Sequence, residues 1–208
     1  MERNPAIQLL ACDYHVVYEP AALRVKVYKK RPEEKLGLIA KYAFTKHFFM
    51  NPYPGCSYAI RRKFFDEVNA LWFAEAPHDE FLWLMATIQD GAWFYNKVLM
   101  SYVRYSDNAS GVRFKDVALQ QENLRYIRKS LASMQTFADL NPCLVPEAYR
   151  QELSAAQIWC GKRQKLMETR NPLRWLAMAP FWGYYNSPQN CLSDLWLVLF
   201  GAFSRKAG

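Results

Sequence analysis

The sequence lacks several features that would assign the protein to a class directly. Its five cysteines are widely spaced and include no Cys-x-x-Cys pair, so neither a zinc site nor a disulfide framework is indicated. No apolar run approaches the roughly 20 residues that cross a bilayer. The start, MERNPAIQ, has no basic and then apolar signal region. We therefore expect a protein of a reducing compartment, cytoplasmic, that is neither exported through such a signal nor integral to a membrane.

Motifs for nucleic-acid binding are also missing. No RNP-like strand, recognition-helix signature or zinc motif accompanies the net charge of +8. A basic surface attracts phosphate groups, whether these belong to a nucleotide or to an anionic lipid. We expect no nucleic-acid partner, and a solvated basic surface without any specific partner remains an alternative.

The chain does have ample apolar material, with 51% hydrophobic and 16% aromatic residues, which is enough for a core. Alternation and turn residues predict strands in the first half of the chain, at 7–18, 23–30, 56–60, 92–96 and 98–105, with a tight turn at Asn96 and Lys97. Helical periodicity predicts helices at 32–44, 62–71, 79–89, 117–138, 146–168, 172–185 and 191–203. This order predicts an α/β unit followed by C-terminal α-helices, with a boundary near Phe114.

The densest cluster of chemically active side chains is EAPHDE, Glu75 to Glu80, at a loop-to-helix junction. A carboxylate at a helix N-terminus is normally a cap, because it accepts hydrogen bonds from unpaired backbone N–H groups. The alternative is that Asp79 faces a cleft and acts as a general base. Glu80 is a second candidate base, although its place one step into the helix favours capping or exposure to solvent.

Two segments, GCSYAIRRKFFDEV and PHDEFLWLMATIQDGAWFYNKVLMSYVRYSDNASG, carry a family resemblance. Their ordered motifs resemble the acceptor half of family 2 glycosyltransferases, in particular the rhamnosyltransferase-like members. The matching positions are Gly55 and Cys56, His78 and Asp79, Gly91, Tyr102, and Asn108 to Gly111. The resemblance covers residues 7–111 and is weaker in the C-terminal helices.

This resemblance implies a partial GT-A type, Rossmann-like sheet-and-helix core in residues 1–114 and a helical region in 115–208. The implied reaction is inverting transfer of a sugar from a nucleotide sugar to a saccharide or lipid-linked acceptor, as in cell-envelope polysaccharide biosynthesis, with Asp79 as the catalytic base. The implied substrate-binding residues are Gly55, Cys56, His78, Glu80, Arg104 and Tyr105. A nucleophilic role for Cys56 is not indicated, because no nearby motif supplies a partner base.

The sequence departs from the family pattern in two places. Family members hold the nucleotide and a divalent metal, Mg²⁺ or Mn²⁺, through an Asp-rich motif, and this chain contains no Asp-x-Asp. We therefore assign no metal ligand and expect the chain to be a fragment, to work with a separate donor-binding polypeptide, or to have lost the activity. In YVRYSDNASG, Val103 and Tyr105 replace the arginine and histidine of the family, and Arg104 is left to offer a guanidinium to a diphosphate.

The C-terminal segment from Asn171 to Phe203 combines tryptophans and tyrosines with flanking arginines and a lysine. This composition suits an anionic membrane surface, where rings lie at headgroup depth and cations lie near phosphates. Attachment would be peripheral, on the cytoplasmic face, because Leu195–Phe203 is too short to cross. Packing of these helices on the rest of the chain or on another subunit remains open. A non-catalytic membrane-surface or protein-binding module derived from a glycosyltransferase is therefore the alternative function.

Overall fold

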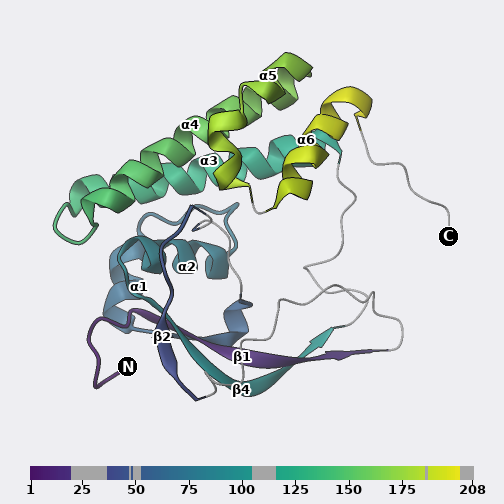
Figure 1. Cartoon of the computed structure of the whole chain (residues 1–208). Coiled ribbons are helices and arrows are strands. Elements are labelled where there is room, and N and C mark those ends of the chain that lie inside the picture. Colours follow the sequence, from purple (N-terminus) through teal and green to yellow (C-terminus); the bar gives the residue numbers. More distant parts are fainter. Residues whose placement is uncertain (20–36, 47, 49–52, 105–115, 186, 202–208) are drawn as a thin grey trace. The chain divides into compact units, whose positions relative to one another are not determined.

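The computed structural model describes residues 1–19, 37–46, 48, 53–104, 116–185 and 187–201 (Figure 1). The chain forms two compact units. Unit 1 comprises Met1–Phe44 and Met50–Arg113, and unit 2 comprises Thr45–Phe49 and Phe114–Gly208. Unit 1 carries a mixed sheet with helices and unit 2 is helical, so the α/β class expected from the sequence is confirmed.

Unit 1 is built on a four-stranded sheet in the order β2–β4–β1–β3. Its strands are β1 (Leu9–Tyr18), β2 (Ile39–Lys41), β3 (Tyr58–Ile60) and β4 (Ala92–Arg104). The central pair, β1 and β4, is parallel, and β2 and β3 pair with them antiparallel. Parallel neighbours need a long crossover, and the crossover here contains α1 (Arg62–Asn69) and α2 (His78–Ile88).

The core of unit 1 centres on α2, in which every residue from Phe81 to Ile88 is buried. The Trp83 ring is surrounded by three tyrosines from separate segments, with ring centroids 4.9 Å from Tyr42, 5.5 Å from Tyr53 and 5.9 Å from Tyr58. Such tilted and offset ring pairs stabilise a core beyond the area that they bury. This cluster holds the segment around Gly55 against α2.

The helix predicted at 32–44 is wrong over its described part. Gly37 has a left-handed φ of +77°, and Ile39–Lys41 forms the edge strand β2 instead. The backbone N–H of Gly37 donates to the Asn96 carbonyl at 2.8 Å, and Asn96 in turn donates to Leu38 at 3.0 Å. Pairing with β4 therefore overrides the helical preference of the local sequence. The strand predicted at 23–30 lies outside the described residues.

The tight turn predicted at Asn96 and Lys97 is also wrong, because β4 continues from Ala92 to Arg104. The register against β1 jumps at this point: Cys12 pairs with Tyr95 and Asp13 with Val98. The two extra residues are accommodated as a bulge, and the backbone of Asn96 is used by β2. A polar Asn-Lys pair therefore marks a shift of register within one long strand.

Unit 2 contains two long helices, α3 (Val117–Leu140) and α4 (Glu147–Thr169), which run side by side in opposite directions (Figure 1). They are followed by α5 (Pro172–Leu176), the 3₁₀ helix η3 (Ala179–Tyr184) and α6 (Pro188–Phe200). The Asp116 side chain caps α3 by accepting from the Leu119 N–H at 2.7 Å, and Ser187 caps α6. Within the described ranges, none of the helices combines the length and apolar character that a bilayer crossing requires.

The single helix predicted at 172–185 is interrupted. α5 ends at Leu176, and the chain re-forms as η3 only at Ala179. Pro180 explains the break, since proline offers no N–H to the Leu176 carbonyl four residues earlier, where an α-helix would need one. The last predicted helix begins earlier than expected, at Pro188, and Gly201 ends it with a φ of +82°.

The core of unit 2 contains a buried ion pair between α4 and α6. The guanidinium of Arg163 donates to Asp194 through Nε at 2.5 Å and Nη2 at 2.8 Å, and the Tyr185 hydroxyl donates to the same carboxylate at 2.9 Å. Asp194 is fully buried, and the guanidinium lies over the rings of Trp159 and Tyr185. Burial alone would lower the pKa of Arg163, but the hydrogen bonds and charge of Asp194 raise it. Arg163 therefore stays charged.

Removing one partner of this pair should cost much stability. We expect Asp194→Ala to lower the free energy of unfolding by about 3–5 kcal/mol, because it leaves the buried Arg163 charge uncompensated. Asp139→Ala is the control: this exposed carboxylate on α3 receives one hydrogen bond from Gln135, and its loss should change stability by less than about 0.5 kcal/mol. Urea unfolding followed by tryptophan fluorescence measures both. Equal effects of the two variants would show that the pair does not stabilise unit 2.

Candidate functional site

The carboxylate of Asp79 is held at the mouth of α2 by two backbone N–H groups. Oδ2 accepts from the Gly55 N–H at 3.0 Å, and Oδ1 accepts from the Glu80 N–H at 3.0 Å. Asp79 lies in the first turn of α2, where the helix dipole favours a negative charge, while the N-cap residue, Pro77, has no side-chain cap. The half-buried carboxylate therefore ties α2 to the 3₁₀ turn η2 (Gly55–Ser57) in a fixed orientation.

The position of Gly55 requires a residue without a Cβ atom. A Cβ built there would lie 2.5 Å from the Cβ of Asp79 and 3.2 Å from its Oδ2. Side-chain atoms of α2 cannot be approached that closely. The spacing Gly55–Asp79, which the sequence suggests only by resemblance, is thus a direct contact in the fold.

Cys56 places an exposed thiol beside this contact. Burial of part of the group raises the pKa of the Cys56 thiol, and the negative charge of Asp79 raises it further, against the lowering effect of a backbone hydrogen bond. The sulfur is therefore protonated at neutral pH, which opposes a nucleophilic role. Cys12 on β1 belongs to the same group: burial raises the pKa of its thiol, and the charges of Asp13 and Cys56 act in the same direction. No sequence signal pointed to Cys12.

His78 is exposed and stacks on an indole ring that the sequence did not single out. The imidazole lies 3.9 Å from Trp72, centroid to centroid, with the rings 15° from parallel. Trp72 is itself fixed, because its Nε1 donates to the Ala76 carbonyl at 2.9 Å. The stacked rings of Trp72 and His78 therefore form a rigid aromatic face next to Asp79, which follows His78 in the chain. The sequence LWFAEAPHDE contains both rings, but only folding of the 73–77 loop brings them together.

Arg104 is not brought to Asp79. It is the last residue of β4 and pairs in register with Tyr18, six residues beyond Cys12 along β1, or roughly 20 Å at the usual rise per strand residue. Its guanidinium lies 5.7 Å from the Tyr102 ring, at the far end of the two central strands. Glu80 is half-buried next to Asp79, and Tyr105 lies outside the described residues.

The donors around Asp79 do not suit a divalent metal. On the η2 side, the groups next to the Asp79 carboxylate are a backbone N–H and protonated thiols, none of which is an oxygen ligand. Mg²⁺ and Mn²⁺ favour several oxygen ligands. In the described part of the chain, no three His, Cys, Asp or Glu side chains are grouped closely enough to hold an ion.

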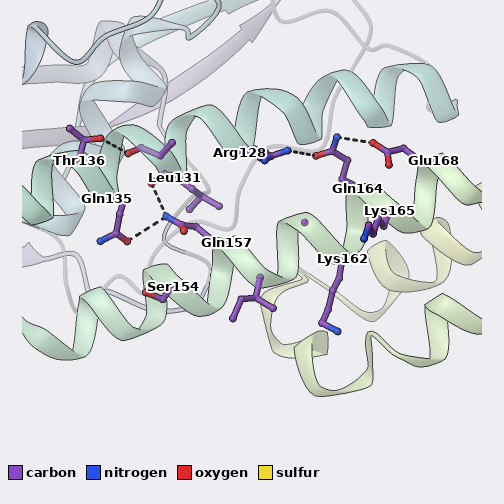
Figure 2. Close-up of a pocket in the computed structure, with 13 residues that line it drawn as sticks. Arg128, Leu131, Gln135, Thr136, Ser154, Gln157, Lys162, Gln164, Lys165 and Glu168 are labelled. Carbon is purple, nitrogen blue, oxygen red and sulfur yellow. Dashed lines mark hydrogen bonds between the residues drawn. The ribbon is translucent and has the colours of Figure 1, made fainter.

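A groove lies on unit 2, between α3 and α4 (Figure 2). This groove of about 960 Å³ is lined by amide, hydroxyl and basic side chains, with Ile158 and Gly161 among its apolar contributors. Its polar groups bond to one another, as in the chain from Arg128 through Gln164 to Glu168. The carboxylate of Glu168 in this groove accepts from the Gln164 amide, and none of the motifs of the sequence lies there, so Asp79 and its neighbours remain the candidate site.

Comparison of the chain with models of known protein families, with curated proteins and with solved structures gives no match. The assignment of the site therefore depends on the geometry and on the motifs themselves.

Two glycine substitutions should have opposite effects on stability. Gly55→Ala forces a Cβ into Asp79 and should lower the free energy of unfolding by about 1–3 kcal/mol. Gly161→Ala on α4 is the control, because its Cβ would meet nothing within 4 Å and helix propensity should raise stability by about 0.5–1 kcal/mol. Denaturant unfolding of both variants is the measurement. A neutral Gly55→Ala would contradict the close contact with Asp79.

Proposed function

We propose that this chain supplies the acceptor side and the catalytic base of an inverting sugar transfer, with Asp79 as the base. The observation that carries the proposal is the Asp79 carboxylate fixed by the Gly55 N–H at 3.0 Å beside the exposed Cys56. Gly55 and Cys56 form one of the motif pairs that resemble family 2 glycosyltransferases, and His78 and Asp79 form the other. Their meeting at one surface is what a common site requires.

In the proposed reaction, an acceptor hydroxyl binds against Asp79 and attacks the anomeric carbon of the donor. The new bond forms from the acceptor oxygen to that carbon, and the bond to the phosphate oxygen breaks, with its electron pair leaving on the nucleoside diphosphate. The hydroxyl proton moves to Asp79. Each carboxylate oxygen keeps a second lone pair beyond its backbone hydrogen bond, so the fixed group can still accept this proton. A positioned base of this kind contributes about 10² to 10⁴ in rate.

The neighbouring groups fit an acceptor-binding surface. The stacked rings of His78 and Trp72 offer a flat face next to the base, and the protonated Cys56 offers a neutral edge. We propose that the nucleotide sugar and its divalent metal are bound elsewhere, by a separate donor-binding polypeptide or a further segment, because the chain has no Asp-x-Asp and the donors around Asp79 do not suit a metal. The dispersed free cysteines support a cytoplasmic location.

One observation favours the alternative of a non-catalytic module. The two N–H groups that Asp79 accepts are the kind of contact that a purely structural carboxylate makes at a helix start. In that case Asp79 joins η2 to α2 and binds no substrate. The two functions differ in whether a saccharide occupies the surface beside Cys56.

Nucleotide binding tests the placement of the donor site. Isothermal titration of the purified chain with UDP and dTDP, with Mg²⁺ or Mn²⁺ present, should give no saturable heat. Metal-dependent binding would contradict a donor site elsewhere. Turnover of a nucleotide sugar by the chain alone would also contradict a donor site elsewhere. If that turnover were lost in Asp79→Asn and retained in Glu80→Gln, it would still support Asp79 as the base.

Protection of Cys56 tests the acceptor site. Alkylation by iodoacetamide at alkaline pH, where the raised pKa still allows thiolate to form, should be slowed by a bound saccharide acceptor at Cys56. The same saccharide should leave the rate unchanged at Cys143, the other exposed thiol, which lies between α3 and α4. Peptide mass spectrometry reports both rates in one sample. If no member of a broad saccharide panel protects Cys56, the acceptor role is wrong and the non-catalytic module is favoured.

A further inference from the structure

The outer face of α6 is apolar from Leu192 to Phe200. Leu192, Trp196, Leu199 and Phe200 fall at positions i, i+4, i+7 and i+8, within one side of a helix. Their exposed fractions lie between 44% and 61%. The opposite side of α6, which includes Leu197 and Val198, is buried. We call the four exposed residues the apolar stripe. A helix that is apolar on both sides needs a second apolar or interfacial environment.

The elements that pack beside α6 also expose apolar side chains. On α5, Leu173 and Leu176 are exposed by 71% and 59%. The Trp175 indole donates to the Cys191 carbonyl at 2.9 Å, which fixes α5 to the start of α6. Trp182 of η3, also exposed, lies 5.5 Å from Trp175. Tryptophans beside exposed leucines are typical of segments that lie at the headgroup level of a bilayer.

Cations border the same surface, and acidic groups are scarce there. Residues 159–201 contain five basic side chains and two acidic ones, a net charge of +3. Arg163 and Asp194 neutralise each other in the core, and Lys162, Lys165 and Glu168 line the groove between α3 and α4. The cations left beside α6 and on α5 are Arg170 and Arg174. Arg170 marks the end of the apolar stripe, since its Nε donates to the Val198 carbonyl at 3.3 Å, and Arg174 is exposed on α5.

We propose that the apolar stripe of α6, with α5 and its flanking cations, binds the surface of an anionic lipid bilayer. α6 has 13 residues, about 20 Å at the usual rise, which is short of the roughly 30 Å of a hydrocarbon core. It therefore lies in the plane of the interface, with the stripe toward the acyl chains and Arg170 and Arg174 among the phosphates. The positive charge selects an anionic leaflet over a neutral one. The inference does not depend on sugar transfer, because lipid binding needs neither donor nor acceptor.

Vesicle sedimentation of the full chain tests this surface. The chain should bind phosphatidylcholine vesicles that contain phosphatidylserine, bind vesicles without it more weakly, and lose affinity as salt is added. The double variant Leu199→Ser and Phe200→Ser should lower the partition coefficient by about tenfold or more. Its control is Leu140→Ser with Leu144→Ser, two leucines at the other end of the α3–α4 hairpin that are at least half exposed, which should leave binding unchanged.

The charge contribution is tested separately. Arg174→Gln should lower binding to the anionic vesicles by about fivefold, the usual effect of one interfacial cation, whereas Arg125→Gln, an exposed arginine on α3, should not. Absence of vesicle binding would overturn the proposal. Equal losses of binding in the Leu199→Ser, Phe200→Ser variant and in the Leu140→Ser, Leu144→Ser variant would overturn it as well. Sedimentation velocity supplies a further outcome: a dimer in lipid-free solution that dissociates in Leu199→Ser with Phe200→Ser would assign the stripe to a second copy of the chain instead.

Discussion

The parallel pairing of β1 with β4 organises unit 1. Each edge strand attaches to one of these two, and the crossover between them carries α1 and α2. The buried α2 is contacted by the tyrosines around Trp83, one of which, Tyr58, begins β3. The segment around Gly55 is held in place by these ring contacts and by β3. Its backbone therefore lies against Asp79. The geometry of the candidate site is thus a consequence of how the sheet is connected.

Periodicity and end signals were sufficient where the local sequence and the fold agree. The long helices α3 and α4 begin and end within a few residues of prediction, because Asp116 caps the first and a proline precedes the second. Prediction failed where distant pairing decides the structure. Residues 39–41 have a helical neighbourhood but add an edge to β4, and Asn96 and Lys97 have turn propensity but are absorbed as a bulge.

The candidate site was predictable in part for the same reason. The motif pairs Gly55–Cys56 and His78–Asp79 could be named from the sequence, but their contact could not, since 21 residues and a whole helix separate them. Trp72 and Cys12 were missed because nothing in their own surroundings distinguishes them from core residues. Arg104 was included by adjacency in the motif, and strand geometry then places it far along β4. The motifs identify candidate residues. Which of these residues come into contact depends on the loop before α2 and on the register of β1 against β4.

The buried carboxylate of Asp194 has a further consequence for α6. From Leu195 to Phe200 every residue of this helix is apolar. Hydrophobic burial therefore gives this half little preference for one rotation, because several of its faces could be turned inward at similar gain. Asp194 breaks that degeneracy, because only one rotation and one axial position bring its carboxylate to Arg163 and Tyr185. A slip by one residue would leave two opposite charges unpaired in the interior. The ion pair therefore fixes the rotation and the axial position of α6, and with them it determines which side chains of α6 are exposed.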